Sequence, residues 1–343
     1  MKLKKLLSVG LVTVLAGSML VGCSPSKGSK EGNSDGNDKL KVTMITDVGG
    51  VNDQSFNQSA WEGLEKAKKD LGVDVKYIES KQEADYANNI ETAIDDGANL
   101  VIGVGFKMEK AIGEAAKTYQ DQKFALIDAD FAGKPPENVE SIMFKAEEAS
   151  YLVGLVAGRL TETNKVGFVG GMEGPVIGVF QAGFTAGVKA AKPEAEVVSQ
   201  YANSFADPAK GKSITNQMIS KGVDIVFHAS GDTGNGVIEA AKEAGKKAIG
   251  VDRDQSSVAP ETVITSAIKR VDVGVYDTVK NLVDGKFNGG KVTVYGLNED
   301  GVGIAETTKP NVAPDIIEYV NQQGEKIKSG EIKVPSTMKE VNK

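Results

Sequence analysis

The sequence predicts an α/β protein in which two doubly wound, parallel-sheet lobes face a common cleft. Two observations carry this prediction. From residue 41 onward, short apolar runs alternate with amphipathic helical stretches, and one β–α plan occurs twice along the chain. Regular β–α alternation is typical of parallel sheets covered by helices on both faces. The length of 343 residues also favours about two domains.

Residues 1–22 have the features of an export signal, which is excluded from the fold. A basic segment is followed by an apolar run that ends in "LVGC", and Cys23 is the only cysteine of the chain. The run is short for a membrane span. The pattern resembles the lipobox of bacterial lipoproteins and implies a lipidated Cys23 on the extracytoplasmic face of the cell membrane. An ordinary signal peptide and an N-terminal transmembrane helix are the alternatives.

Residues 23–39 are predicted to be the lipidated cysteine and a flexible linker. Ser, Gly, Asn and charged residues dominate this stretch, and it has no apolar side chains to bury. A single cysteine leaves no disulfide and no CxxC site. The net charge of −7 and the aromatic content of 6% argue against nucleic-acid binding.

The strands and helices follow in a regular order from residue 41. Nine strand-like runs are expected at residues 41–47, 73–80, 99–105, 123–130, 165–171, 195–202, 224–231, 246–252 and 262–269. Helices between them are expected at residues 61–72, 88–97, 110–120, 180–192, 214–222 and 237–245. Each helix has apolar residues at three- and four-residue spacing, and several end in Gly.

An internal echo links two parts of the chain. Residues 95–130 and 220–254 share a glycine, a strand, an "EAAK" helix and a final acidic strand end, which aligns Asp128 with Asp252. Duplicated lobes explain this match. A chance likeness between two doubly wound segments is the competing explanation.

The segments that follow the strands are the candidate ligand contacts, because open α/β sheets bind ligands outside the carboxyl ends of their strands. They are Asp47 with the loop after it, and residues 103–106, 128–131, 170–174, 202–207, 228–235 and 252–254.

These segments contain few of the residue patterns that enzymes need. The single histidine, His228, excludes multi-histidine metal sites, and no GxSxG elbow accompanies it, so we expect it to pack at a strand end. The stretch "DPAKGKS" lacks the first glycine of a P-loop, and "GGMEG" lacks GxGxxG spacing. No metal, cofactor or catalytic residue is predicted. Asp128 and Asp252, on opposite lobes, could hydrolyse a glycosidic bond or simply accept hydrogen bonds from hydroxyls.

Several motifs together point to a family. The "LVGC" end, "DVGGVNDQSFNQSAW", "IDAD", "SFAD", "GVDRDQ" and "TSAIKRVD" resemble the basic membrane protein (Bmp) family of PnrA-like, purine-nucleoside-binding lipoproteins. The resemblance covers essentially the whole mature chain from about Lys41. It implies the type I periplasmic-binding-protein fold, with two lobes joined by crossing strands. It also implies a monomer that delivers purine nucleosides to an ABC permease and its ATPase.

The resemblance also implies a ligand site. Phe56 and Phe205, from opposite lobes, would sandwich the purine. Asp128 and Asn57 would read the base edge, with Asp47 nearby. Asp252 and Lys269 would hold the ribose, aided by the backbone at Gly231. A ribose-type sugar ligand, a tethered nucleoside hydrolase, and a surface adhesin or sensor without a transporter are the alternatives.

The remaining expectations concern neighbours of the site and the limits of the lobes. Asp53 and Ser55 are expected to cap a helix, and Arg253 to form an ion pair between the lobes. The first lobe is expected to comprise residues 40–145 plus 259–291, and the second residues 146–258 plus 292–343.

Overall fold

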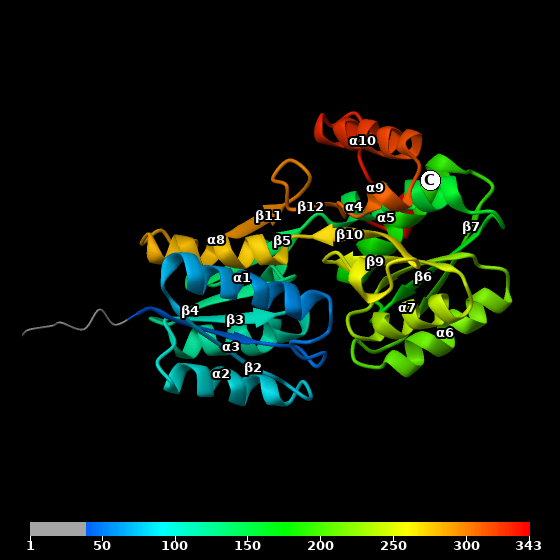
Figure 1. Ribbon diagram of the computed structural model, residues 1–343. Helices are drawn as coiled ribbons and strands as arrows, with labels where there is room; N and C mark the ends of the chain where they lie inside the picture. The colour runs from blue at the N-terminus through cyan, green and yellow to red at the C-terminus, as the bar shows by residue number, and fades with distance from the viewer. Residues whose placement is uncertain (1–38) are drawn as a thin grey trace, which may run out of the picture. The chain divides into compact units, whose positions relative to one another are not determined.

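Two six-stranded sheets organise residues 39–343, the part of the chain that the computed structural model describes (Figure 1). The first sheet has the order β2-β1-β3-β4-β5-β11, and all of its neighbouring strands are parallel. Its strands are β1 (Lys41–Ile45), β2 (Asp74–Ile78), β3 (Leu100–Val104), β4 (Lys123–Ile127), β5 (Val139–Phe144) and β11 (Val292–Tyr295).

The second sheet repeats this order as β7-β6-β8-β9-β10-β12. Its strands are β6 (Lys165–Gly170), β7 (Glu196–Tyr201), β8 (Ile225–Ala229), β9 (Lys247–Asp252), β10 (Val263–Lys269) and β12 (Val302–Ile304). Only the β10–β12 pair is antiparallel within the described sheets. The predicted architecture of two doubly wound, parallel-dominated sheets is therefore confirmed.

Helices cover both faces of each sheet, because alternate residues of the buried strands point to opposite sides. They are α1 (Phe56–Leu71), α2 (Asp85–Asp95), α3 (Glu109–Thr118), α4 (Ala146–Leu160), α5 (Pro175–Ala191), α6 (Pro208–Ser220), α7 (Thr233–Glu243), α8 (Val271–Val283), α9 (Thr308–Asn311), α10 (Pro314–Lys328) and α11 (Met338–Val341). Short 3₁₀ turns span Phe106–Met108, Phe131–Gly133 and Ser256–Val258. In the first lobe, α1 and α8 lie on one side of the sheet and α2 and α3 on the other (Figure 1).

The chain crosses between the lobes three times. β5 ends in the first sheet, and the next helix, α4, packs on α5 of the second lobe. β10 ends in the second sheet, and the next helix, α8, packs on α1 of the first lobe. The segment between β11 and β12 makes the third crossing. Each lobe thus receives one helix from a chain segment that has just left the other lobe's sheet.

Two boundaries of the expected lobes are wrong. Residues 263–269 were expected in the first lobe, but β10 pairs in parallel with β9 and is the fifth strand of the second sheet. In the second sheet, β10 lies between β9 and β12. The chain therefore crosses to the first lobe only after Lys269, the last residue of β10. Residues 292–295 were expected in the second lobe, but β11 covers the edge of β5 in the first sheet.

The echo in the sequence corresponds to equivalent places in the two sheets. β3 and β4 occupy the positions in the first sheet that β8 and β9 occupy in the second. Asp128 directly follows β4 and Asp252 is the last residue of β9, and both have a positive φ, 64° and 65°. A non-glycine residue in this region is uncommon, although Asp tolerates it better than most. The chain therefore turns in the same way at both strand ends and brings a carboxylate to each.

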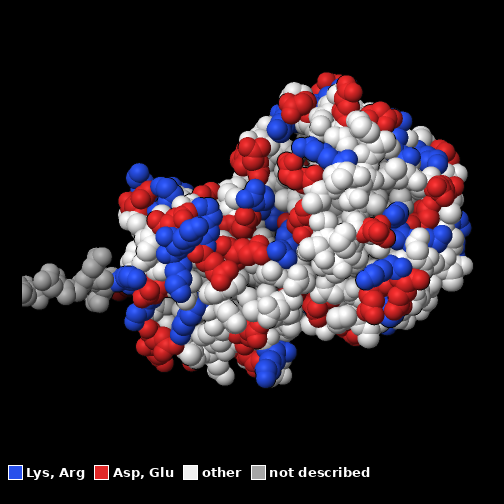
Figure 2. All heavy atoms as spheres, in the orientation of Figure 1, with Lys and Arg blue, Asp and Glu red and all other residues white. Residues whose placement is uncertain are grey.

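The described residues include no helix that combines the length and apolarity needed to cross a bilayer. On the face shown in Figure 2, basic and acidic side chains are interspersed over the described residues. The expected signal peptide, the linker up to residue 38 and Cys23 lie outside the described residues.

Candidate ligand-binding site

One cavity lies where the carboxyl ends of both sheets meet, with about 600 Å³ of space between its lining atoms, including space open to solvent. All eight predicted contact residues line it: Asp47, Phe56, Asn57, Asp128, Phe205, Gly231, Asp252 and Lys269. The structure therefore brings together, in one place, residues that are up to 222 positions apart in the sequence.

The first lobe contributes a rigid polar network at the start of α1. The Asp53 carboxylate accepts hydrogen bonds from the backbone N–H of Ser55 and Asn57, both at 2.9 Å, and of Gln58 at 3.1 Å. These bonds satisfy N–H groups that a helix start leaves free, so the capping role expected of Asp53 is confirmed. Asn57 Nδ2 donates to Asp47 Oδ1 at 2.7 Å, and Asn57 Oδ1 accepts from the Asp47 N–H at 3.1 Å.

Ser55 departs from the expectation that it caps α1. It occupies the N-cap position, but its side chain makes no capping hydrogen bond. Its hydroxyl instead donates to Asp252 Oδ2 in the second lobe.

The acidic and basic groups at the cavity form a second network, held between the lobes. Lys269, at the end of β10, forms an ion pair with Asp128 at the end of β4, and both side chains are nearly inaccessible to solvent. The direct partner of Lys269 is Asp128, and Asp252 takes its hydrogen bond from Ser55. Because β10 belongs to the second sheet, Lys269 reaches Asp128 across the cleft.

Aromatic side chains supply the apolar part of the cavity. Phe56 comes from the first turn of α1 and Phe205 from the segment between β7 and α6. The Lys269 ammonium lies over the Phe56 ring, 4.4 Å from its centroid. Phe106 meets Phe205 edge to face, with ring centroids 6.3 Å apart. A Cβ at Gly171 would lie 2.2 Å from the Phe205 ring, so only glycine allows the ring to rest against that backbone.

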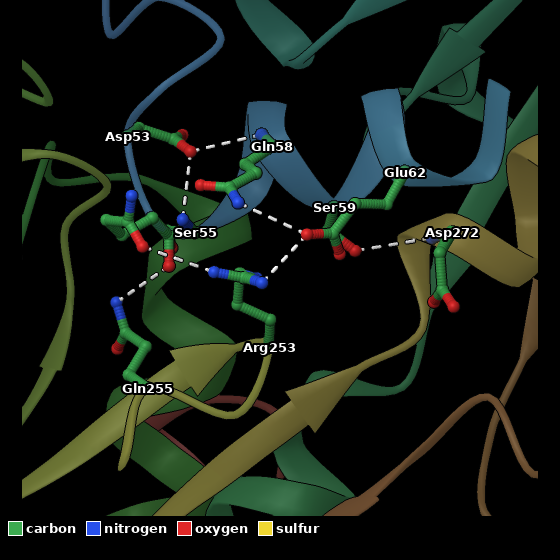
Figure 3. Close-up of polar contacts among 9 residues, drawn as sticks. Asp53, Ser55, Gln58, Ser59, Glu62, Arg253, Gln255 and Asp272 are labelled. Atoms are coloured by element: carbon green, nitrogen blue, oxygen red, sulfur yellow. Dashed lines mark hydrogen bonds and ion pairs between the residues drawn. The ribbon is translucent and has the colours of Figure 1, made fainter. Parts of the chain in front are cut away.

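A set of contacts outside the cavity joins the lobes around the start of α1 (Figure 3). Arg253 Nη2 pairs with Glu62 Oε1 at 2.7 Å, which confirms the ion pair expected between the lobes. Arg253 Nη1 donates to Gln54 Oε1 at 3.3 Å, and Gln255 Nε2 donates to the Gln54 carbonyl at 3.1 Å. The lobes in this structure are therefore closed on each other.

Burial changes the acid–base behaviour of several groups near the cavity. It raises the pKa of Asp252, while the nearby Lys269 ammonium and the Ser55 hydrogen bond act in the opposite direction. It also raises the pKa of Asp47, opposed by hydrogen bonds from Asn57 and the Gly49 N–H. His228 is fully buried beside Gln255, as expected of a residue packed at a strand end, and burial lowers its pKa to about 4.

The chemistry that this arrangement offers is recognition of a donor-rich, flat ligand. Four carboxyl groups and two ammonium groups line the cavity beside the aromatic rings. Carboxylate oxygens accept hydrogen bonds and aromatic faces bind planar groups. Among residues 39–343, no group of three or more His, Cys, Asp or Glu residues could hold a metal ion.

Five lining residues were not predicted from the sequence. Lys107 and Val251 each lie one position outside a predicted segment, and Val176, Ile177 and Phe180 come from the first turns of α5. The helix was expected to begin at residue 180, but it begins at Pro175, directly after Gly174. Proline in a first helical turn after a glycine is a recognised start signal, and it would have placed this helix start at the strand end.

Comparisons with known proteins agree with this geometry. Residues 40–338 match the family described as Bmp, ABC transporter substrate-binding protein PnrA-like. The CD4+ T-cell-stimulating antigen of Listeria innocua is 44% identical, over 97% of this chain and 99% of its own length. The ABC transporter nucleoside-binding protein BmpA of Lactococcus lactis subsp. cremoris is 36% identical, over 97% of this chain and 99% of its own.

A solved structure with the same fold comes from an ABC transporter system of Aeropyrum pernix K1. This solute-binding protein is 30% identical, with a TM-score of 0.80 over 88% of this chain and 95% of its own. The two lobes therefore have the type I periplasmic-binding fold, and the chain has a solute-binding role. The chain belongs to the Bmp family of PnrA-like substrate-binding proteins of ABC transporters.

Proposed function

We propose that the protein binds purine nucleosides between its two lobes and delivers them to an ABC permease. The observation that carries the proposal is the composition of the cavity, in which Phe56 and Phe205 from opposite lobes line the same space as Asp128, Asp252 and Lys269. A nucleoside has one flat, weakly hydrated part and one hydroxyl-rich part, and the cavity offers groups for both.

The base would lie against the aromatic rings. Stacking on aromatic side chains contributes about 1–3 kcal/mol per base in nucleic-acid binding. Asp128 would accept hydrogen bonds from N–H groups of the base edge, with Asn57 and Asp47 beside it. Asn57 is held by both Asp47 and Asp53, so its amide is oriented before a ligand arrives, which lowers the entropic cost of binding.

The ribose would lie against the second lobe. A carboxylate accepts hydrogen bonds from two neighbouring hydroxyls, and bonds to a charged group are stronger than neutral ones. Asp252 is such a group and is 6% exposed. Lys269 carries further N–H donors for ribose oxygens, and the backbone at Gly231 lines the same part of the cavity.

The charges of the cavity favour a ligand without phosphate. The lining contains Asp47, Asp53, Asp128 and Asp252 against Lys107 and Lys269. Lys269 is paired with Asp128, and Lys107 with Glu83 at 2.6 Å. A phosphate would therefore meet an excess of carboxylates, and nucleotides should bind much more weakly than nucleosides.

The location and partners follow from the family and the N-terminal pattern. A lipid on Cys23 would hold the protein on the extracytoplasmic face of the cell membrane, with residues 24–39 as the tether. The partners would be a permease and its cytoplasmic ATPase, and the protein would act as a monomer without enzymatic activity. Nucleic acid is not an expected partner, because the net charge is −7.

Calorimetry with guanosine, inosine, adenosine, cytidine, ribose and guanosine monophosphate tests the proposal. Tight binding of purine nucleosides, weak binding of the others and no release of free base are the expected results. Binding of ribose without guanosine would favour a sugar carrier. Free purine that accumulates during incubation would favour a nucleoside hydrolase, and no binding at all would favour an adhesin or sensor.

A further inference from the structure

Ser55 has an unusual position at the start of α1. A serine at the N-cap commonly accepts a hydrogen bond from a backbone N–H of its own helix. Here the Asp53 carboxylate accepts from the N–H groups of Ser55, Asn57 and Gln58. The Ser55 hydroxyl is therefore not needed by its helix and makes no capping bond.

The hydroxyl is used across the cleft instead. It donates to Asp252 Oδ2, and the two residues are 0% and 6% exposed. Ser55 belongs to the first lobe and Asp252 ends β9 of the second. The bond therefore exists only when the lobes are closed, and it commits one Asp252 oxygen while Asp252 also lines the cavity.

Other contacts fix the Ser55 loop against the second lobe. The Asn235 amide donates to the Asp53 carbonyl at 3.3 Å, and the Gln255 amide donates to the Gln54 carbonyl at 3.1 Å. Figure 3 shows Gln255 and Arg253 reaching toward this end of α1. Because the backbone on the N-terminal side of Ser55 is held in this way, its hydroxyl has a defined position relative to Asp252.

We propose that Ser55 is a positioning residue that orients the Asp252 carboxylate toward the ligand's ribose hydroxyls when the lobes close. This inference rests on the proposed function, in which Asp252 holds the ribose. Closure and ribose recognition then share one carboxylate, and a ligand without the 2′ and 3′ hydroxyls gains from Ser55 only its contribution to closure. A residue that only favoured closure would affect every ligand equally.

The test compares inosine with 2′,3′-dideoxyinosine, which keeps the base and lacks both hydroxyls. Calorimetry is done on the wild type, Ser55→Ala, Asp252→Asn and the double variant. Because a hydrogen bond to a charged group is stronger than a neutral one, Ser55→Ala should lower inosine affinity about tenfold or more. In Ser55→Ala, inosine affinity should fall at least about threefold more than dideoxyinosine affinity, and in the Asp252→Asn background Ser55→Ala should cost less than about twofold for either ligand.

Ser59→Ala is the matched control. Ser59 lies one turn later on α1, is also buried, and accepts a hydrogen bond from the Asp272 N–H of α8 in the same lobe. This variant removes a buried hydroxyl without touching the contact between the lobes, so inosine affinity should stay at the wild-type value. If Ser55→Ala fails to fold, Ser55→Cys, which keeps the size with a weak donor, should show the same selective loss.

Three results would overturn the inference. They are an unchanged inosine affinity in Ser55→Ala, an equal loss for inosine and dideoxyinosine, and an undiminished loss in the Asp252→Asn background. Each of these leaves the proposed function standing, because the wild type still binds inosine. A wild-type protein that binds no nucleoside would overturn both.

Discussion

Acidification should lower the stability of the protein through the buried histidine of the second lobe, His228. His228 is fully buried, its Nε2 lies 2.9 Å from Gln255 Oε1, and burial lowers its pKa from 6.5 to about 4. The stability that this neutral imidazole contributes is complete above pH 6.5 and is lost as the pH falls toward 4. Between pH 7 and pH 5, this single group should lower the free energy of unfolding by about 2 kcal/mol.

Asp53 works in the opposite direction over the same range. Burial raises its pKa from 3.8 to about 7, against the backbone hydrogen bonds that it accepts. A carboxyl group with a raised pKa contributes stability at low pH and loses it as the pH rises through 7. Acidification from pH 7 to pH 5 should therefore raise the contribution of Asp53 to the free energy of unfolding by about 2 kcal/mol. The effects of His228 and Asp53 should nearly cancel in the wild type.

A His228→Gln variant separates the two contributions. It keeps a side chain that can bond to Gln255 and removes the titrating imidazole, while the Asp53 contribution remains. Urea unfolding followed by circular dichroism, at pH 7 and pH 5 without ligand, measures the stability of both proteins. The stability of the wild type minus that of the variant should be about 2 kcal/mol lower at pH 5. A difference that is the same at both pH values would refute a buried neutral His228.

Three further substitutions test the site. Phe56→Ala should lower nucleoside affinity by about 1–3 kcal/mol in calorimetry with a normal folded spectrum; a sharp fall in Tm with unchanged affinity would mean that the ring is part of the core. Lys269→Met should destabilise the fold by about 3–5 kcal/mol in urea unfolding, because it leaves buried Asp128 unpaired. Adding Asp128→Asn should restore most of that loss, and an equally unstable double variant would contradict the pairing. Arg253→Gln removes a partly exposed ion pair with Glu62 that joins the lobes, so nucleoside release should be about two- to fivefold faster in stopped-flow fluorescence. An unchanged release rate would show that the pair does not hold the lobes closed.

The place of the site was predictable from the sequence because parallel strands bring their carboxyl ends to one edge. Asp47, Asp128 and Asp252 each follow an apolar run, and each lines the cavity. The strand ends in the sequence therefore indicate where the polar residues lie, but not which partners they bind. The roles in a nucleoside site came from the family resemblance.

The lobe boundaries and hydrogen-bond partners were beyond the sequence for a physical reason. A strand followed by a crossing helix has the same local pattern whichever sheet it joins, so β10 was expected in the wrong lobe. The Lys269–Asp128 pair depends on that placement. Ser55 had the local pattern of a helix cap, and only the closed arrangement of the lobes shows its hydroxyl on Asp252.

The most direct test of the central claim is a crystal structure of the protein with guanosine. We predict the purine between Phe56 and Phe205, its edge on Asp128, and the ribose hydroxyls on Asp252 and Lys269. Guanosine bound with its base away from both rings, or bound outside this cavity, would contradict it.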